Sequence, residues 1–315
     1  MLLTGATGFI GSSLLTALVA KHYKLIAPSR TPLDELPENV TMPLLHDISA
    51  LPDNSDWFVG CDVVIHIAAK AHVYGVSLAE FTRVNTEGTL RLAQLAKDAG
   101  VKRFIFLSSI GVNGIFNTTP FNVSDTPAPV EAYAASKFAA EQGLKQIAAG
   151  SDMELVIIRP PLVYGAGAPG NVSKLVTLVQ KNLPLPLGAI HNKRSLVALD
   201  NLIDLIITCI DHPKAANQTF LVSDDQDVST TELLQMMTRA AGKKPRLLPV
   251  PVSWLKLAGK LTGKQAVVDR LCGNLQVDIS HTKETLAWKP PVTVEEGVAR
   301  CFTPARPPSL PKRRE

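Results

Sequence analysis

The chain has 315 residues, of which 46% are hydrophobic and 19% are charged, a composition that excludes a mainly disordered protein. At about 150 residues per domain, its length allows about two domains. The formal net charge is +4, and the last thirteen residues contribute four basic residues and one acidic residue to it. The rest of the chain has a net charge of only +1, so we expect no nucleic-acid partner.

The cysteines and the N-terminal stretch indicate a cytoplasmic protein. The four cysteines are widely spaced and form no C-x-x-C pair, which predicts reduced thiols and no metal site. The uncharged residues 1–20 lack a basic N-terminal region, and Thr4–Gly8 interrupts their apolar run. They therefore predict neither a signal peptide nor membrane insertion.

Short apolar runs alternate with longer helical patterns in the first two-thirds of the chain. Strands are expected at Leu2–Thr4, Lys24–Ala27, Thr41–Leu45, Asp62–Ile67, Arg103–Leu107 and Glu154–Arg159, and helices at Phe9–Ala20, Ala79–Gly100 and Glu131–Ala149. This order predicts an α/β fold with a Rossmann-type doubly wound parallel sheet. The strands are uniformly apolar, as expected when both faces of a sheet are buried, and His66 within the fourth is expected to be a core histidine.

After Tyr164 the pattern becomes mostly helical. We expect strands at Ser195–Leu199 and Thr219–Val222, and helices at Asn201–Asp211, Ser229–Gly242 (opened by a capping box with Glu232), Val252–Leu261, Ser280–Ala287 and Val294–Phe302. Residues 1–163 and 197–223 are predicted to form the sheet domain, and residues 164–196 and 224–302 a smaller substrate-binding domain. Residues 303–315 are predicted to be a disordered Pro-rich basic tail. Trp254 and Trp288 are expected in the core.

A glycine-rich turn joins the first strand to the first helix with the spacing G-x-x-G-x-x-G. A Cβ at these glycines would block the approach of a pyrophosphate to backbone N–H groups, and the helix N-terminus adds free donors. We therefore predict a dinucleotide site formed by Gly5, Thr7, Gly8, Phe9, Ile10 and Gly11.

The second strand ends in Ser29-Arg30, where an acidic residue would bind the ribose 2′-hydroxyl. Serine and arginine suit a 2′-phosphate instead, which favours NADP over NAD. Asp47 and Ile48 follow the third strand and are expected near the adenine. Ala68 and Ala69 follow the fourth strand and are small, as a backbone contact with the cofactor requires.

Tyr133 and Lys137 are four residues apart in a helical pattern, so their side chains share one face. A free tyrosine has a pKa near ~10, and a nearby cation lowers it toward the range of a useful base. Lys137 and an oxidised nicotinamide are both candidates for that cation. Ser108 and Ser109 end the fifth strand, at the sheet edge where ligands bind, so a hydroxyl there can bond the reacting oxygen.

Taken in order, the three glycines, Ser108-Ser109, Tyr133 and Lys137 resemble the short-chain dehydrogenase/reductase superfamily. The segments Arg159–Gly165 and Arg194–Asp200 resemble its extended branch of nucleotide-sugar epimerases, dehydratases and ketoreductases. The resemblance covers about residues 1–302 and is greatest to UDP-glucose 4-epimerase-like proteins of bacterial O-antigen clusters. It implies a UDP-sugar substrate and a homodimer.

The resemblance also implies roles for individual residues. Ser109, Tyr133 and Lys137 are the catalytic set, and Lys137 also binds the nicotinamide ribose. Asn85 and Pro160 contact the cofactor. Ser108, Asn171, Arg194 and Arg270 are the candidate substrate contacts, with Arg194 on the diphosphate, because a guanidinium pairs well with phosphate oxygens.

Three functions remain open at this point. A 4-keto-sugar reductase is preferred over a 4-epimerase with recycled cofactor, because Ser29-Arg30 favours NADPH, which a reductase consumes. Val112-Asn113-Gly114 after the catalytic serine also departs from the Val-Tyr-Gly that is frequent in the epimerases. A non-catalytic NADP-binding sensor or scaffold is disfavoured because Ser109, Tyr133 and Lys137 are all present.

Overall fold

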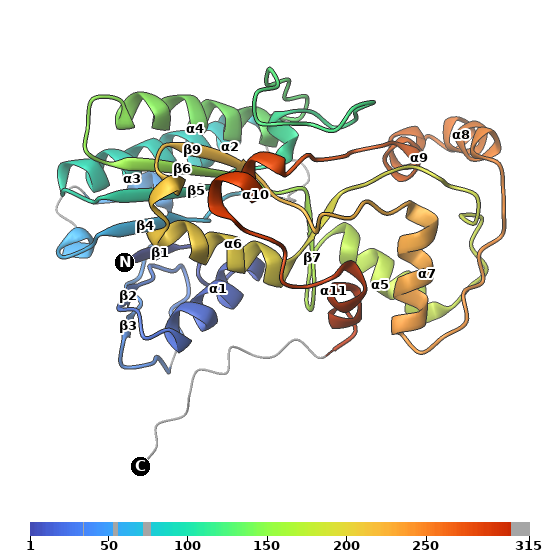
Figure 1. Ribbon diagram of the computed structural model, residues 1–315, viewed down its shortest axis with the longest axis horizontal. Helices are drawn as coiled ribbons and strands as arrows, with labels where there is room; N and C mark the ends of the chain where they lie inside the picture. The colour runs from blue at the N-terminus through green and yellow to red at the C-terminus, as the bar shows by residue number, and fades with distance from the viewer. Residues whose placement is uncertain (34, 53–55, 72–76, 304–315) are drawn as a thin grey trace, which may run out of the picture.

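The computed structural model describes residues 1–33, 35–52, 56–71 and 77–303. Apart from Thr303, the tail that was predicted to be disordered lies outside these residues. Two groups of elements are visible in Figure 1: a layered α/β body, and a mostly helical part beside it.

The body is built on a seven-stranded parallel sheet with the order β3-β2-β1-β4-β5-β6-β9 (Figure 1). In spatial order the strands are β3 (Val40–Thr41), β2 (Leu25–Ile26), β1 (Leu2–Thr4), β4 (Val63–His66), β5 (Arg103–Leu107), β6 (Glu154–Arg159) and β9 (Gln218–Leu221). This confirms the predicted doubly wound sheet. The chain winds outward in opposite directions from β1 and β4, so the crevice for a ligand is expected between these two strands.

Helices cover both faces of the sheet and bury two separate cores. The helices α1 (Phe9–Ala20) and α6 (Leu199–Asp211) cover one face, and α3 (Gly88–Asp98) and α4 (Ala132–Ala148) cover the other (Figure 1). Successive strand residues face opposite cores, as the period of two requires: Leu3 packs with α1 and α6, while Leu2 packs with α3.

The long helix expected at Ala79–Gly100 is interrupted. Its place is taken by α2 (Leu78–Phe81), a π-helical turn η3 (Thr82–Glu87) and α3. Short 3-10 turns among the described residues complete the body: η1 (Ile48–Ala50), η2 (Asp56–Phe58), η4 (Ile110–Val112) and η5 (Pro213–Ala215). The π turn carries Asn85 in a buried position, and π turns are frequent at functional sites.

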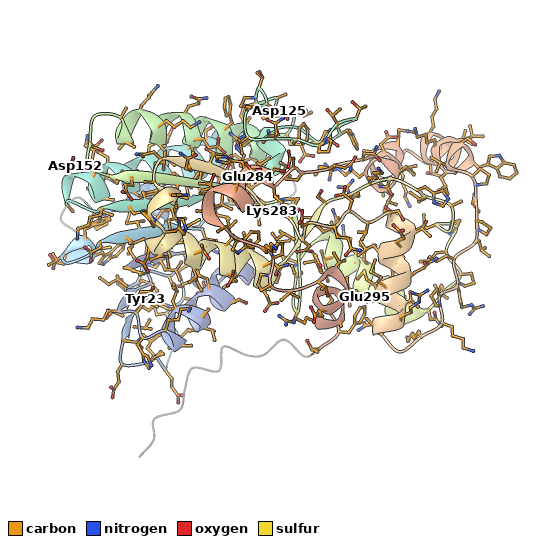
Figure 2. The ribbon with its side chains drawn as sticks, viewed as in Figure 1. Tyr23, Asp125, Asp152, Lys283, Glu284 and Glu295 are labelled. Carbon is orange, nitrogen blue, oxygen red and sulfur yellow. The ribbon has the colours of Figure 1, made fainter. Side chains whose placement is uncertain are left out.

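The second part has a two-stranded parallel sheet and most of the remaining helices. These elements are β7 (Leu162–Tyr164), β8 (Leu196–Ala198), α5 (Asn171–Lys181), α7 (Thr230–Ala240), α8 (Val252–Leu261), α9 (Gln265–Cys272), α10 (Ser280–Leu286) and α11 (Val294–Arg300). The capping box of Ser229 and Glu232 is confirmed at the start of α7. Figure 2 shows Lys283 on α10, and this side chain pairs with Asp225 just after β9.

Three of these elements were not predicted, and each lacks the usual sequence signals. The helix α5 follows Gly170, a residue with φ +67° that has no side chain to cap the helix. The helix α9 begins after Lys264, which makes no capping side-chain bond. The strand β7 has three residues directly after a Pro-Pro pair.

The expectation for the tryptophans was half wrong. Trp288 is 5% exposed and its indole Nε1 donates to Asp204 at 2.8 Å, as expected for a core residue. Trp254, in contrast, is 70% exposed. The helix α8 packs closely on α9 at Gly259, where an added Cβ would lie 2.8 Å from a methyl of Val268, and this packing leaves the indole outside the core.

His66 is a core histidine, as predicted. It is fully buried, and its two ring nitrogens lie 2.6 Å from the Thr4 hydroxyl and 2.8 Å from the Thr89 hydroxyl. Burial, with a smaller contribution from the charge of Lys137, lowers the pKa of His66 to about 3. The imidazole is therefore neutral in the folded protein at neutral pH.

This neutral histidine makes stability depend on pH. Between about pH 6.5 and pH 3 the unfolded chain binds a proton that the folded protein does not bind, so stability falls as the pH falls through this window. At pH 4.5 the loss relative to pH 7 should be about 2–3 kcal/mol from this residue. The free energy of unfolding of His66→Asn, measured with urea at several pH values, should depend less on pH between pH 7 and pH 4.5. An equal pH dependence in both proteins would contradict the assignment.

Candidate active site

The glycine-rich turn lies where the carboxyl ends of β1 and β4 meet. Gly5 has φ +77°, and a Cβ there would lie 2.7 Å from the backbone nitrogen of Ala68. The same amide of Ala68 donates to the Thr4 hydroxyl at 3.3 Å. The predicted cofactor residues after these two strands are therefore in direct contact, at the switch point of the sheet.

Two glycines of the turn have different physical roles. A Cβ on Gly11 would lie 1.9 Å from the carbonyl oxygen of Gly5, so this residue allows α1 to pack on the turn. A Cβ on Gly8 would lie 3.4 Å from the same oxygen, and the fold can accommodate a contact at this distance. Gly8 caps α1, whose first N–H groups have no partners within the helix. A side chain at Gly8 would fill the space beside those donors, so the turn fits a dinucleotide pyrophosphate.

The ends of β2 and β3 carry the predicted adenosine residues. Ser29 is buried and its hydroxyl donates to the Thr31 carbonyl at 3.0 Å, with the Thr7 hydroxyl 3.4 Å away, whereas Arg30 is exposed. Asp47 caps η1 through the Ser49 amide at 2.9 Å and pairs with Arg83.

The turn after β3 is held against the π-helical segment. Ile48 is buried, and a Cβ on Gly88 would lie 2.8 Å from its side chain. This close approach fixes η1 beside the start of α3. The carboxylate of Asp47 therefore organises the chain's own loop at the rim of the cofactor crevice.

The three predicted catalytic residues lie on backbone segments that touch one another. Lys137 on α4 is 1% exposed, and its ammonium Nζ donates to the Leu107 carbonyl at 2.7 Å, at the end of β5. Ser109, two residues further on, accepts from the Gly111 amide at 3.1 Å. A Cβ on Gly111 would lie 3.2 Å from the Cβ of Ala134, the neighbour of Tyr133.

Burial opposes the expected lowering of the Tyr133 pKa. Burial raises the pKa of Tyr133 to about 12, rather than lowering it. Burial also lowers the pKa of Lys137 to about 7, which Glu141 offsets in part. A lysine in this state is a weak source of positive charge. Of the two cations considered for lowering the phenol pKa, the nicotinamide is therefore the one that the site favours.

Asn85 joins the loop after β4 to the catalytic helix. Its carboxamide Oδ1 accepts from the Lys70 amide at 2.7 Å, and its Nδ2 donates to the Lys70 carbonyl at 3.0 Å and to the Ser136 hydroxyl at 3.1 Å. Ser136 lies between Tyr133 and Lys137 in α4. Asn85 therefore holds the Ala68-Ala69 loop in register with the helix that carries the acid/base pair.

A buried ion pair that was not predicted lies beneath the catalytic residues. The carboxylate of Glu141 on α4 accepts from Arg159 at the end of β6, at 2.9 Å and 2.5 Å. It also accepts from the Ser108 hydroxyl at 2.5 Å, and Arg159 donates to Asn113 at 2.9 Å. All four side chains are at most 3% exposed. The one available signal was the position of Glu141, one helical turn after Lys137.

Ser108 therefore differs from its predicted role as a substrate contact. Its hydroxyl is committed to Glu141 in the interior, because residues 108 and 109 of the extended chain point to opposite sides. Pro160 is also buried, and its carbonyl accepts from the Ile110 amide at 2.9 Å, which holds the turn that starts at Ser109.

The structure brings two of the predicted substrate residues together. Arg194 donates to the Arg270 carbonyl at 2.9 Å, and burial together with the charge of Arg270 lowers the pKa of Arg194. Arg270 in turn pairs with Glu131, which caps the helix of Tyr133. Two neighbouring guanidinium groups suit an anionic ligand. Asn171 is exposed at the start of α5.

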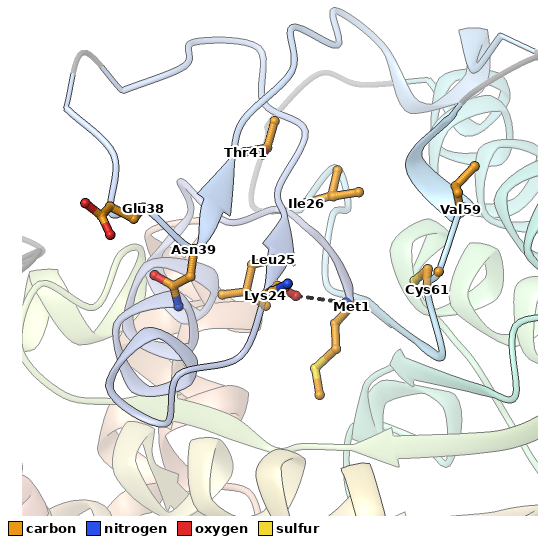
Figure 3. Close-up of a pocket in the computed structure, with 10 residues that line it drawn as sticks. Met1, Lys24, Leu25, Ile26, Glu38, Asn39, Thr41, Val59 and Cys61 are labelled. Atoms are coloured by element: carbon orange, nitrogen blue, oxygen red, sulfur yellow. Dashed lines mark hydrogen bonds between the residues drawn. The ribbon is translucent and has the colours of Figure 1, made fainter.

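One open pocket among the described residues lies away from this site. It measures about 540 Å³ and lies at the amino ends of the strands, between Met1, Lys24 and Asn39 on one side and Val59 and Cys61 on the other (Figure 3). Ligands of open α/β sheets bind at the opposite edge, where the carboxyl ends lie. The pocket is therefore unrelated to the catalytic residues.

Within the described residues, no helix is long and apolar enough to span a membrane. The described part of the chain also has no group of three or more His, Cys, Asp or Glu side chains arranged to hold a metal ion.

The comparisons with known proteins define the class. Residues 1–223 match the NAD dependent epimerase/dehydratase family, so the chain belongs to this family. The predicted short-chain dehydrogenase/reductase fold and NAD-dependent enzyme are thereby confirmed, whereas the preference for NADP is not tested.

Two relatives and one solved structure illustrate the similarity. The chain is 49% identical to a Vibrio cholerae UDP-glucose 4-epimerase, covering 94% of this chain and 92% of that protein. It is 26% identical to an Escherichia coli O157:H7 N-acetyl-alpha-D-glucosaminyl-diphospho-ditrans,octacis-undecaprenol 4-epimerase, covering 96% and 94%. The Bordetella bronchiseptica enzyme WbmG, solved with NAD and UDP, shares the fold with a TM-score of 0.76 at 19% identity, covering 94% and 91%.

The two glycines of the turn allow a matched test of the cofactor site. Gly11→Ala should lower the free energy of unfolding by at least about 2 kcal/mol, because its Cβ meets backbone. Gly8→Ala should cost about 1 kcal/mol or less but weaken NAD binding at least about tenfold. Urea unfolding and calorimetric titration with NAD measure the two effects. Unchanged NAD affinity in Gly8→Ala would reject the pyrophosphate assignment.

The buried ion pair gives a second test. Glu141→Gln leaves Arg159 buried without its counter-ion and should destabilise the protein by about 3–5 kcal/mol. A double variant, Glu141→Leu with Arg159→Met, should recover much of this stability because it removes both charges. If the pair positions Ser109 and Lys137, kcat of the double variant should stay low while KM changes little. Recovery of kcat together with stability would show a structural role alone.

Proposed function

We propose that the protein is a C4 epimerase of UDP-hexoses or UDP-N-acetylhexosamines that recycles its NAD. The observation that carries this proposal is the 49% identity to a UDP-glucose 4-epimerase over 94% of the chain. The Escherichia coli relative is also a 4-epimerase of a sugar diphosphate. This evidence favours the epimerase over the 4-keto-sugar reductase that Ser29-Arg30 alone led us to prefer.

The residues at the end of β5 fit proton transfer at the C4 oxygen. Tyr133 would take the proton of the 4-hydroxyl as the sugar is oxidised and return it as the sugar is reduced. Ser109 would hydrogen-bond the same oxygen. Bound NAD supplies the hydride acceptor and donor, and the positive charge of its oxidised ring lowers the pKa of a nearby phenol.

Lys137 would contribute mainly through position. Its Nζ is fixed on the Leu107 carbonyl, which places it between the catalytic helix and the end of β5, two residues before Ser109. Since its pKa is lowered to about 7, it can gain a proton when negative charge develops on the phenol. This arrangement would stabilise the phenolate without a permanent positive charge in the buried site when no substrate is bound.

Arg194 and Arg270 support a sugar diphosphate as the substrate. Both lie on the second part of the fold, and the link of Arg270 to Glu131 connects them to the start of the catalytic helix. A diphosphate held there would place the attached hexose toward Tyr133. Asn171 remains a predicted contact from α5, and the homodimer and the O-antigen context also remain predictions.

The exposed Arg30 is available to pair with the 2′-phosphate of NADP. Ser29 uses its hydroxyl within its own turn, so Arg30 is the group that would discriminate NADP from NAD. A family of NAD-dependent enzymes and NAD-bound structural neighbours favour NAD. We propose that Arg30 permits NADP without requiring it.

The test is interconversion without added reduced cofactor. Purified protein with UDP-glucose should form UDP-galactose, and UDP-N-acetylglucosamine should form its C4 epimer, as separated by anion-exchange chromatography. Tyr133→Phe should reduce kcat about 100- to 10,000-fold while the variant still binds NAD, because the acid/base is lost and the pyrophosphate site is not.

A different set of results would reject the epimerase. Stoichiometric oxidation of NADPH with a UDP-4-keto-6-deoxyhexosamine, without interconversion of either epimer pair, would replace the epimerase by the reductase. Full activity of Tyr133→Phe would remove the tyrosine from the mechanism in both cases.

A further inference from the structure

The helix α8 lies at the end of the molecule far from the sheet (Figure 1), and it carries an exposed apolar stripe. Trp254, Leu257 and Leu261 are 70%, 59% and 78% exposed. Their spacing of three and four residues places them on one face of the helix. Val267 on α9 is 56% exposed and belongs to the same helical pair. We call Trp254, Leu257 and Leu261 the α8 stripe.

The stripe is not a half-formed core. The inner face of α8 already packs on α9 at Gly259, where an added Cβ would lie 2.8 Å from Val268. The opposite side of α8 therefore stays uncovered when the helical pair is complete. Tryptophan and leucine on the outer face of a ten-residue helix need another apolar surface to become buried.

The surroundings of the stripe are strongly basic. Residues 243–270 contain seven Lys and Arg residues and one acidic residue, although the whole chain has a net charge of only +4. Lys243 contacts the Gln180 carbonyl and Arg270 pairs with Glu131. The other five basic residues are exposed: Lys244, Arg246, Lys256, Lys260 and Lys264. The net charge of the whole chain does not reveal this cluster, because acidic residues elsewhere offset its positive charge.

The positions of the lysines match an interface between water and lipid. Lys256 and Lys260 are four residues apart and share the face of α8 between Gly259 and Leu257, so they can reach phosphates while the apolar side chains enter the acyl region. Tryptophan is favoured at such interfaces, and each basic residue near an anionic surface adds about 1 kcal/mol. A nucleic acid would use the charges and leave the stripe exposed.

We propose that the α8 stripe and its lysines bind the protein peripherally to an anionic phospholipid surface. Binding of this kind is compatible with the finding that no helix of the described residues spans a membrane, because the helix lies in the interface plane. The catalytic residues lie on the sheet body, so the surface adds to the proposed function and does not depend on it.

The experiment uses flotation with large unilamellar vesicles of phosphatidylglycerol and phosphatidylethanolamine, and with phosphatidylcholine vesicles for comparison. The full chain should float with the anionic vesicles and not with the neutral ones, and 0.5 M NaCl, about a 4 Å screening length, should weaken binding severalfold. The fluorescence of Trp254 should shift to the blue on binding, since Trp288 is already buried and Trp57, the third tryptophan, lies on the sheet body.

Matched variants separate the apolar from the electrostatic part. Leu257→Ser with Leu261→Ser, and Lys256→Glu with Lys260→Glu, should each weaken vesicle binding at least about tenfold. Val59→Ser is the control, because Val59 is 78% exposed like Leu261 but lies on the sheet body. The circular dichroism spectrum and urea unfolding without vesicles report folding in every variant.

Three results would overturn the proposal. They are failure of the active protein to float with anionic vesicles, equal binding to neutral vesicles, and unchanged binding of the serine double variant. Sedimentation of the free protein tests a second copy as the occupant. An assembly that the serine variant dissociates would assign the stripe to a contact between chains instead.

Discussion

The ion pair between Glu141 and Arg159 is the constraint on which the site depends. It joins α4 to the end of β6, and Ser108 connects the same carboxylate to the end of β5. Burying two charges is costly unless each is fully hydrogen-bonded, so three elements must meet in one geometry. That geometry aligns the helix of Tyr133 and Lys137 with the end of β5 and with Ser109, two residues further on.

The cofactor crevice depends on a similar close contact between backbones. Gly5 and Ala68 come so near that a single Cβ would prevent it, and Asn85 holds the following loop to α4. The same contacts therefore link the dinucleotide turn to the catalytic helix. This continuity explains why a sheet edge, and not the open pocket at the amino ends of the strands, is the candidate site.

Local patterns predicted the sheet body well and the second part less well. Helix α1 and strands β1, β5 and β6 have the predicted bounds, because apolar runs between turn residues report burial directly. The helices α5 and α9 begin without capping side chains, and β7 is only three residues long, so they lacked such signals. Trp254 was placed in the core on its residue type, which the packing of α8 on α9 overrules.

The sequence by itself determined the parallel sheet and the glycine turn, which follow from spacing along the chain, and its resemblance to a known family indicated the candidate acid/base pair. Only the tertiary structure decided how these groups behave. It raised the pKa of Tyr133, lowered that of Lys137, and committed Ser108 to Glu141 rather than to a ligand. Burial and the pairing of residues distant in the chain set these properties, and neither is a function of local sequence.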